Sequence, residues 1–94
     1  MFGFFQIERV MAMTYAQVEQ MIKEILAKQL GLDVAKIDIN SKLMEDLGMD
    51  SFGSIETAFE LEEKFELKIP DEAIYNAKIV KDIVDHIAKE KGAV

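Results

Sequence analysis

The sequence contains no cysteine and no tryptophan, and only one proline and one histidine. Without cysteine, the chain cannot form disulfide bonds, thiolate metal sites or a cysteine nucleophile. No apolar run approaches the roughly 20 residues that span a bilayer. The start of the chain is apolar, but Glu8 and Arg9 interrupt it and no basic segment precedes it, so it does not resemble a secretory signal peptide. We therefore expect a cytoplasmic protein with no membrane span.

Basic residues are also scarce. The 11 Lys and Arg residues are outnumbered by 18 Asp and Glu residues, which gives a formal net charge of −7. Because nucleic-acid binding needs clustered Lys and Arg, we expect no nucleic acid as a partner. An acidic surface predicts partner proteins with basic patches, and the alternative is that the charge only maintains solubility. The acidic residues follow no calcium-loop spacing and a lone histidine cannot build a zinc site, so we expect no metal.

What is present is a pattern of helices within a length that suits one domain. Residues 14–17 fit a capping box, and apolar residues then recur at helical spacing until Gly31. Similar patterns predict a second helix over residues 51–65, a short one after Pro70 and a last one from about Val80 to Gly92. The predicted fold is all-α, a four-helix bundle with three longer helices, one short helix and a long first loop.

The long loop covers residues 32–50 and shows no strong periodicity. Loops of this length are uncommon unless they are held in place or functional. We expect its scattered apolar residues to hold it against the helices; they are Leu32, Val34, Ile37, Ile39, Leu43 and Leu47. The alternation at Ile37 and Ile39 resembles a strand, but no second strand is predicted to pair with it.

The first 13 residues are the least interpretable part. Met11 and Met13 directly precede the first helix, so residues 1–12 are either an upstream extension or a consequence of start-codon choice. A third interpretation is that their apolar side chains pack onto the body. We treat residues 1–13 as an N-terminal extension and residues 14–94 as the domain.

The second predicted helix carries two apolar stripes. Phe52, Ile55 and Phe59 form one, and at about 100° per residue a second stripe lies roughly a third of a turn away. The second stripe consists of Ala58, Leu61 and Phe65. One stripe can face the core while the other lies at the surface. The alternative is a helix buried on one broad face, although several glutamates on this segment favour contact with water.

Ser51 stands where this helix begins, directly after a turn at Gly48 and Asp50. Free N–H groups and the positive end of the helix dipole favour an anion at such a position. We interpret Ser51 as an attachment point for a phosphate-bearing group. A hydrolase nucleophile is disfavoured, because the spacing is not that of a G-x-S-x-G elbow. The one histidine, His86, lies on a polar helix flank where we expect it to be solvated.

The wider context of Ser51 resembles a known family. The segments that carry the resemblance are EDLGMDS at 45–51, IE at 55–56, LEEKF at 61–65 and KIPDE at 68–72. In this order and spacing they are similar to acyl carrier proteins, over about residues 14–89. The resemblance implies that a phosphopantetheinyl transferase moves 4′-phosphopantetheine from coenzyme A onto Ser51, helped by Asp50. The terminal thiol of that arm would carry an acyl group as a thioester, in fatty acid, lipid or polyketide-type biosynthesis.

The resemblance also implies roles for other residues in a monomeric carrier that is not an enzyme. Partner enzymes that load and transfer acyl groups would contact a set made up of Phe52, Ile55, Glu56, Phe59, Glu62 and Glu63. An acyl pocket would be lined by Leu61, Phe65 and Ile69, with contributions from the last helix. Gly53 and Thr57 depart from the usual family residues, and Thr57 suggests a more polar interior.

Two alternatives remain beside this interpretation. The D-S-F-G segment at residues 50–53 also resembles D-alanyl or aminoacyl carriers. An adaptor with a carrier-like fold, whose serine is never modified, would also suit the acidic second helix.

Overall fold

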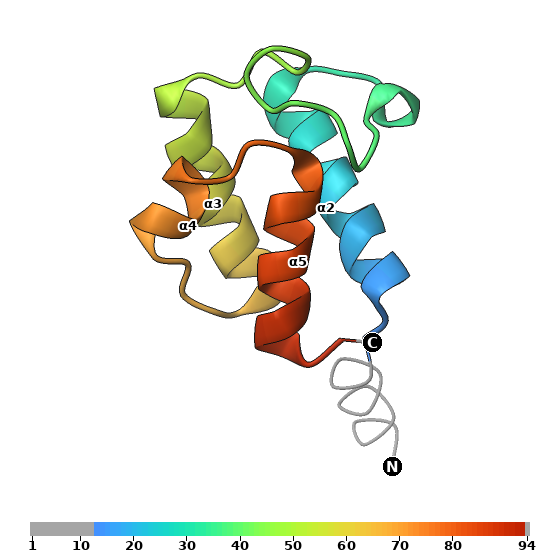
Figure 1. The fold of residues 1–94 in the computed structure, drawn as a ribbon, viewed down its shortest axis with the longest axis vertical. Coiled ribbons are helices and arrows are strands. Elements are labelled where there is room, and N and C mark those ends of the chain that lie inside the picture. The colour runs from blue at the N-terminus through green and yellow to red at the C-terminus, as the bar shows by residue number, and fades with distance from the viewer. Residues whose placement is uncertain (1–12, 94) are drawn as a thin grey trace.

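The computed structural model describes residues 13–93 (Figure 1). Its elements are α2 (Tyr15–Leu30), the 3-10 turn η1 (Val34–Lys36), α3 (Ser51–Phe65), α4 (Asp71–Tyr75) and α5 (Val80–Lys91). The described residues thus form four α-helices and no strand, which confirms the all-α prediction. The interpretation of the N-terminal extension falls on residues that, apart from Met13, lie outside the described part. Met13 itself is partly buried against the core.

The predicted capping residues lie at both ends of α2. At the start of α2, Gln17 N–H donates to Thr14 Oγ1 at 3.1 Å and Thr14 N–H donates to Gln17 Oε1 at 2.9 Å, as the predicted capping box requires. Gly31 ends the helix in the left-handed conformation, with φ 67°. Glu66 ends α3 with φ 53°, where no glycine is available.

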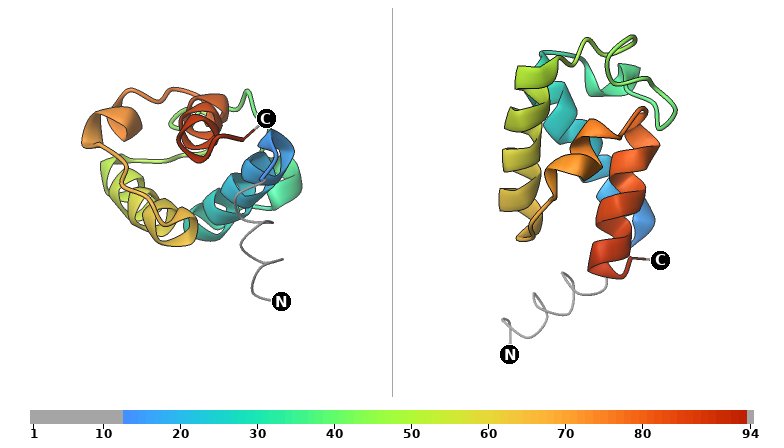
Figure 2. Two further views of the ribbon diagram at one scale, coloured as in Figure 1. Left: turned by 90° about the horizontal axis from the view of Figure 1, so that it is seen from below. Right: turned by 60° about the vertical axis from the view of Figure 1, so that its left-hand side comes forward.

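The core lies between α2, α3 and α5. α2 contacts both α3 and α5, while α4 contacts both α3 and α5 and so covers the side left open between them. The view from below in Figure 2 shows the helices arranged around this common interior. The fully buried large side chains are Val18, Ile22, Leu26, Leu43, Thr57, Leu61, Val80, Val84 and Ile87. Burial of this apolar surface is the main force that holds the helices together.

The long loop between α2 and α3 is tied to the start of α5 by main-chain hydrogen bonds. Leu43 N–H donates to Lys78 O at 3.0 Å, Val80 N–H donates to Ser41 O at 3.0 Å, and an isolated β-bridge joins residues 42 and 79. The loop therefore pairs with the segment before α5 at residue 42, just after the alternating residues Ile37 and Ile39, and sequence periodicity did not indicate this pairing.

The expected apolar anchors of this loop divide into two groups. Ile37, Leu43 and Leu47 are buried, as predicted. Leu32 and Ile39 are half-buried, and Val34 is exposed, so the prediction was wrong for Val34. Val34 lies in η1, a turn that contacts α2, has no buried residue and was not predicted.

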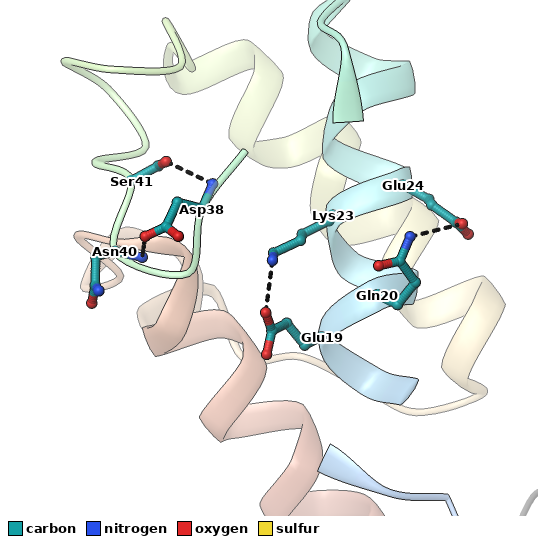
Figure 3. A network of polar contacts seen from close by, with 7 residues as sticks. All are labelled: Glu19, Gln20, Lys23, Glu24, Asp38, Asn40 and Ser41. Atoms are coloured by element: carbon teal, nitrogen blue, oxygen red, sulfur yellow. Dashed lines mark hydrogen bonds and ion pairs between the residues drawn. The ribbon is translucent and has the colours of Figure 1, made fainter. Parts of the chain in front are cut away.

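Figure 3 shows polar contacts within the turn at residues 38–41 of the loop and along α2. Asp38 N–H donates to Ser41 Oγ, and Asp38 Oδ2 accepts from Asn40 N–H, both at 2.9 Å. On α2, Lys23 and Glu19 form an ion pair one turn apart at 2.7 Å. The two hydrogen bonds of Asp38 fix the geometry of this turn in the loop, whereas the ion pair supports α2 alone.

A side-chain hydrogen bond joins the two ends of the described chain. Tyr15 Oη, at the start of α2, donates to Asp85 Oδ1 on α5 at 2.5 Å, and Lys81 Nζ lies 2.7 Å from Asp85 Oδ2. Burial, followed by the hydrogen bond to Asp85, raises the pKa of Tyr15 to about 12. The hydrogen bonds from Lys81 and Tyr15 lower the pKa of Asp85.

No helix within residues 13–93 is long and apolar enough to cross a bilayer.

Candidate functional site

The start of α3 is built around the side chain of Asp50. Its Oδ1 accepts the N–H of Gly53 at 2.7 Å, which is the hydrogen bond expected of an N-cap residue. Its main-chain oxygen accepts both the N–H and the hydroxyl of Ser54, at 2.9 and 3.0 Å. Asp50 therefore fixes the first turn of the helix, and the residue that follows it is Ser51.

Ser51 is the first residue of α3 and is exposed. Within residues 13–93, its hydroxyl forms no hydrogen bond, and neither its own N–H nor that of Phe52 meets a main-chain acceptor. A hydroxyl with no competing partner thus stands beside free donors at the positive end of a helix. An anionic phosphate ester on this oxygen fits that environment.

The turn before the helix presents Ser51 outward. Gly48 adopts φ 73°, a left-handed conformation that side chains disfavour. Met49 then turns inward, is buried, and donates its N–H to Leu43 O at 2.9 Å. This bond anchors the residue two positions before Ser51 to the loop, so the serine sits on a fixed backbone.

Gly53, a departure from the usual family residue, has a local explanation. A Cβ atom added at Gly53 would lie 3.2 Å from Asp50 Oδ1 and 3.5 Å from Met49 Cγ. The absence of a side chain therefore leaves room for the cap carboxylate to approach. An acidic side chain here would also place a second negative charge beside Asp50.

The outer stripe of α3 is exposed as the two-stripe prediction requires. Phe52 is 68% exposed, Ile55 46% and Phe59 67%. On the inner stripe Leu61 and Phe65 are buried, so the alternative of a helix buried on one broad face is wrong. Three large apolar side chains that point into water form an unusual surface for a small protein.

The glutamates of α3 have different surroundings. Glu56 and Glu63 are exposed. Glu62 is half-buried, and its Oε2 accepts the main-chain N–H of Ile69 at 2.8 Å, a contact that the sequence did not indicate. Glu62 therefore closes the loop between α3 and α4 while it lies beside exposed Glu63.

A groove of about 240 Å³ lies between α3 and α4, which contact each other. Its lining residues are Ser54, Ile55, Ala58, Phe59, Glu62, Ile69, Asp71, Ile74 and Tyr75. Of the three residues that the resemblance assigns to an acyl pocket, Ile69 lines this groove. Leu61 and Phe65 are buried in the core instead. The lining begins at Ser54, less than one helical turn from Ser51, so the groove opens close to the exposed hydroxyl.

Two polar atoms lie inside the bundle; that of Thr57 agrees with the polar interior expected there, and that of His86 was not anticipated. Thr57 is fully buried, and its Oγ1 has no hydrogen-bond partner within residues 13–93. His86 is half-buried, and its Nε2 is enclosed and likewise without a partner in that range. The expectation that His86 is solvated was therefore wrong, because α4 covers the flank of α5 on which it lies.

His86 and Ser51 do not come together as a catalytic pair would. No hydrogen bond joins them within residues 13–93, and the small cavity that His86 lines with Ile69, Ala73, Ile74, Ile83 and Ile87 includes no residue of α3. Among residues 13–93, no group of three or more acidic or histidine side chains is placed to hold a metal ion.

Comparisons with known proteins agree with this geometry. The family model described as the phosphopantetheine attachment site matches residues 20–87. The acyl carrier protein of Syntrophobacter fumaroxidans (strain DSM 10017 / MPOB) is 41% identical over 81 residues, which cover 86% of this chain and 100% of that relative. The chain belongs to the acyl carrier protein family, whose cofactor is 4′-phosphopantetheine. When bound, that cofactor supplies the thiol that this cysteine-free chain lacks.

Proposed function

We propose that Ser51 is the residue that carries the phosphopantetheine arm. The observation that supports this most directly is its position: an exposed, unpartnered hydroxyl at the first residue of α3, beside free main-chain N–H groups. The attachment joins Ser51 Oγ to the phosphate of the arm as a phosphodiester. The serine proton and the nucleotide part of coenzyme A leave, the latter as adenosine 3′,5′-bisphosphate. In this role Asp50 holds the helix start that presents the oxygen.

The surface around Ser51 serves as the docking surface for partner enzymes. Its apolar part consists of Phe52, Ile55 and Phe59, which point into water in the free protein. Exposed Glu56 and Glu63 supply negative charge on the same helix. A partner with a basic rim around an apolar patch would complement both features. The partners are a phosphopantetheinyl transferase and enzymes that load or transfer acyl groups.

Glu62 belongs to this surface in a different way. Its carboxylate is half-buried and engaged by Ile69 N–H, so its charge contributes to the field of α3 while its geometry holds the neighbouring loop. A basic partner group that paired with Glu62 would compete with that hydrogen bond.

The groove between α3 and α4 is the proposed site for the acyl chain. Ile55, Ala58, Ile69 and Ile74 give it apolar walls, and it begins near Ser51. Leu61 and Phe65 form the core behind it. An acyl chain that enters the groove loses contact with water, and this favours its retention. The groove shields the thioester from water only where the thioester lies inside it.

In this proposal the protein performs no chemistry of its own. It acts as a cytoplasmic monomer that moves acyl thioesters between enzymes of fatty acid, lipid or polyketide-type biosynthesis. Within residues 13–93 the hydroxyl of Ser51 forms no hydrogen bond to a base, which supports a carrier rather than a hydrolase.

The test is intact mass after incubation with coenzyme A and a broad-specificity phosphopantetheinyl transferase. We expect the parent chain to gain one phosphopantetheine and the Ser51→Ala variant to gain none. Ser54→Ala is the matched control, because Ser54 lies one turn along the same helix with its hydroxyl already bonded to Asp50 O. A folded parent that gains no mass would favour the adaptor alternative, and a modified Ser51→Ala variant would place the site elsewhere.

A further inference from the structure

His86 is the one histidine of the chain, and its enclosed nitrogen has no role in the function proposed above. His86 lines a small cavity of about 10 Å³ between α4 and α5, and its Nε2 is buried with no hydrogen-bond partner within residues 13–93. All the other side chains around that cavity are aliphatic; they are Ile69, Ala73, Ile74, Ile83 and Ile87. Among the described residues, the buried imidazole nitrogen therefore belongs to the one polar side chain that lines this aliphatic cavity.

A single water molecule does not explain this arrangement well. An enclosed water is held by two to four polar partners, and the side chains here offer only one. A buried polar atom that stays unpaired is destabilising, so it calls for a partner that the isolated chain does not supply.

The cavity adjoins the groove between α3 and α4. Ile69 and Ile74 line both spaces, so their side chains form the wall between them. Ile69 follows the loop that Glu62 holds, and Ile74 is the one buried residue of the short helix α4. A chain that fills the groove and displaces these two side chains therefore reaches the nitrogen of His86.

We propose that His86 is a specificity-determining residue that selects acyl chains bearing a hydroxyl group near the distal end. This inference rests on the proposed function, because the chain must be attached at Ser51 and enter the groove. A hydroxyl fits either tautomer of a neutral imidazole, since it can both donate and accept a hydrogen bond. A carboxylate fits less well, because a charge would have to enter an otherwise aliphatic cavity.

The experiment loads the full chain with matched pairs of acyl-phosphopantetheine arms from acyl-CoA and ω-hydroxyacyl-CoA of equal carbon number, over a series of lengths. Intact mass first verifies loading at Ser51. The 15N resonance of His86 Nε2 is then recorded, and it needs no assignment by mutation because the chain has one histidine. The second readout is protection of the thioester against hydroxylamine, which reports how much of the chain is held in the groove.

We expect the Nε2 resonance to shift with the hydroxyacyl arm at one chain length and not with the plain arm of that length. His86→Phe keeps an aromatic ring and removes the nitrogen. In that variant the preference for the hydroxyacyl arm, measured as the ratio of the two protections, falls by roughly two- to ten-fold, as one hydrogen bond would give. Glu90→Gln, an exposed position one turn further along α5 that lies outside the groove and the cavity, is the control and leaves the ratio unchanged.

An unchanged Nε2 resonance at every length overturns the inference even if the His86→Phe variant does not fold. Equal preference in the parent and a folded His86→Phe variant also overturns it. Both results leave the attachment at Ser51 intact, whereas a failure of loading in the mass measurement rejects the proposed function and this inference together.

Discussion

The carboxylate of Glu62 accepts the main-chain N–H of Ile69 across the loop that joins α3 to α4, at 2.8 Å. Both residues line the groove between these helices. One side chain therefore lies beside the exposed acidic surface of α3 and also fixes the wall of the apolar groove. This relationship separates Glu62 from Glu63, which is exposed.

The Glu62→Ala substitution should destabilise the fold. It leaves the partly buried N–H of Ile69 without its charged acceptor, and we expect a loss of about 1–2 kcal/mol in the free energy of unfolding. Urea denaturation measures this loss, and hydrogen exchange at the Ile69 amide should accelerate. Glu63→Ala is the control and should stay within about 0.5 kcal/mol of the parent. Equal losses in the two variants would contradict the assignment.

The Asp50→Ala substitution should cost about 1 kcal/mol of stability, because Gly53 N–H loses its cap. Asp50→Asn keeps a side-chain oxygen in the same place and should cost less. Thermal unfolding of the two variants measures the difference. If Asp50→Asn is loaded at the parent rate, the role of Asp50 is confined to holding the helix; slower loading at full stability would indicate a direct contact with the transferase.

Two phenylalanines of α3 should respond in opposite ways to the same change. Phe59 is 67% exposed and Phe65 is 2% exposed. We expect Phe59→Ala to leave stability within about 0.5 kcal/mol of the parent while it slows transfer by partner enzymes. Phe65→Ala should cost about 3–5 kcal/mol through the cavity it leaves. If Phe59→Ala leaves the rate of transfer by partner enzymes unchanged, Phe59 is not part of the docking surface.

The charge on α3 should act mainly on the rate of encounter. Glu63→Lys and Glu90→Lys change the net charge equally, but only the first lies on the proposed docking surface, and both positions are exposed. We expect Glu63→Lys to reduce the loading rate at low salt and the effect to shrink as salt rises. Stopped-flow or quenched loading assays at two salt concentrations measure this. Equal effects of the two variants would mean that net charge alone steers the partner.

The hydrogen bond between Tyr15 and Asp85 should give stability a plateau in pH. The pKa of Asp85 is lowered in the folded state, so its contribution is present above its unfolded pKa of about 3.9 and is lost as pH falls through the lower folded value. The pKa of Tyr15 is raised to about 12 from 10.0, so its contribution is present below pH 10.0 and is lost as pH rises to about 12.

Tyr15→Phe tests this plateau. The variant should be less stable than the parent by about 0.5–1 kcal/mol at neutral pH, a modest effect because Asp85 is exposed. The difference should narrow toward both ends of the pH range in urea titrations. Tyr75→Phe removes an exposed phenol that forms no side-chain hydrogen bond within residues 13–93, and its effect should not vary in this way.

Local patterns predicted most of the helices. The capping box at Thr14, the left-handed end at Gly31 and the break at Pro70 act through neighbouring residues, so they can be recognised without the fold. The two stripes of α3 were also predictable, because helical periodicity alone decides which side chains share a face.

Contacts between distant segments could not be predicted in this way. The pairing of the loop with residues 78–81, the bond from Ile69 to Glu62 and the enclosure of His86 each depend on how α4 and α5 fold back. His86 illustrates the reason. Its polar sequence neighbours, Asp85 and Lys89, indicate solvent, but its environment is set by α4, which the local sequence does not reveal. The role of Ser51 was predicted from its sequence context, and both this role and the modification stay predictions.

The hydrogen bonds that tie the long loop to the start of α5 have one more consequence. Together with the bond from Met49 N–H to Leu43 O, they join the residues just before α3 and the beginning of α5 into one frame, and Ser51 stands on that frame. α4 lies outside it, has five residues, lacks a side-chain cap and buries only Ile74. In the function proposed above, the wall that would move to admit an acyl chain is thus a short helix without a side-chain cap, while the proposed docking surface begins beside the hydrogen-bonded loop. Under that proposal, each partner enzyme meets the same docking surface whichever acyl group the carrier holds.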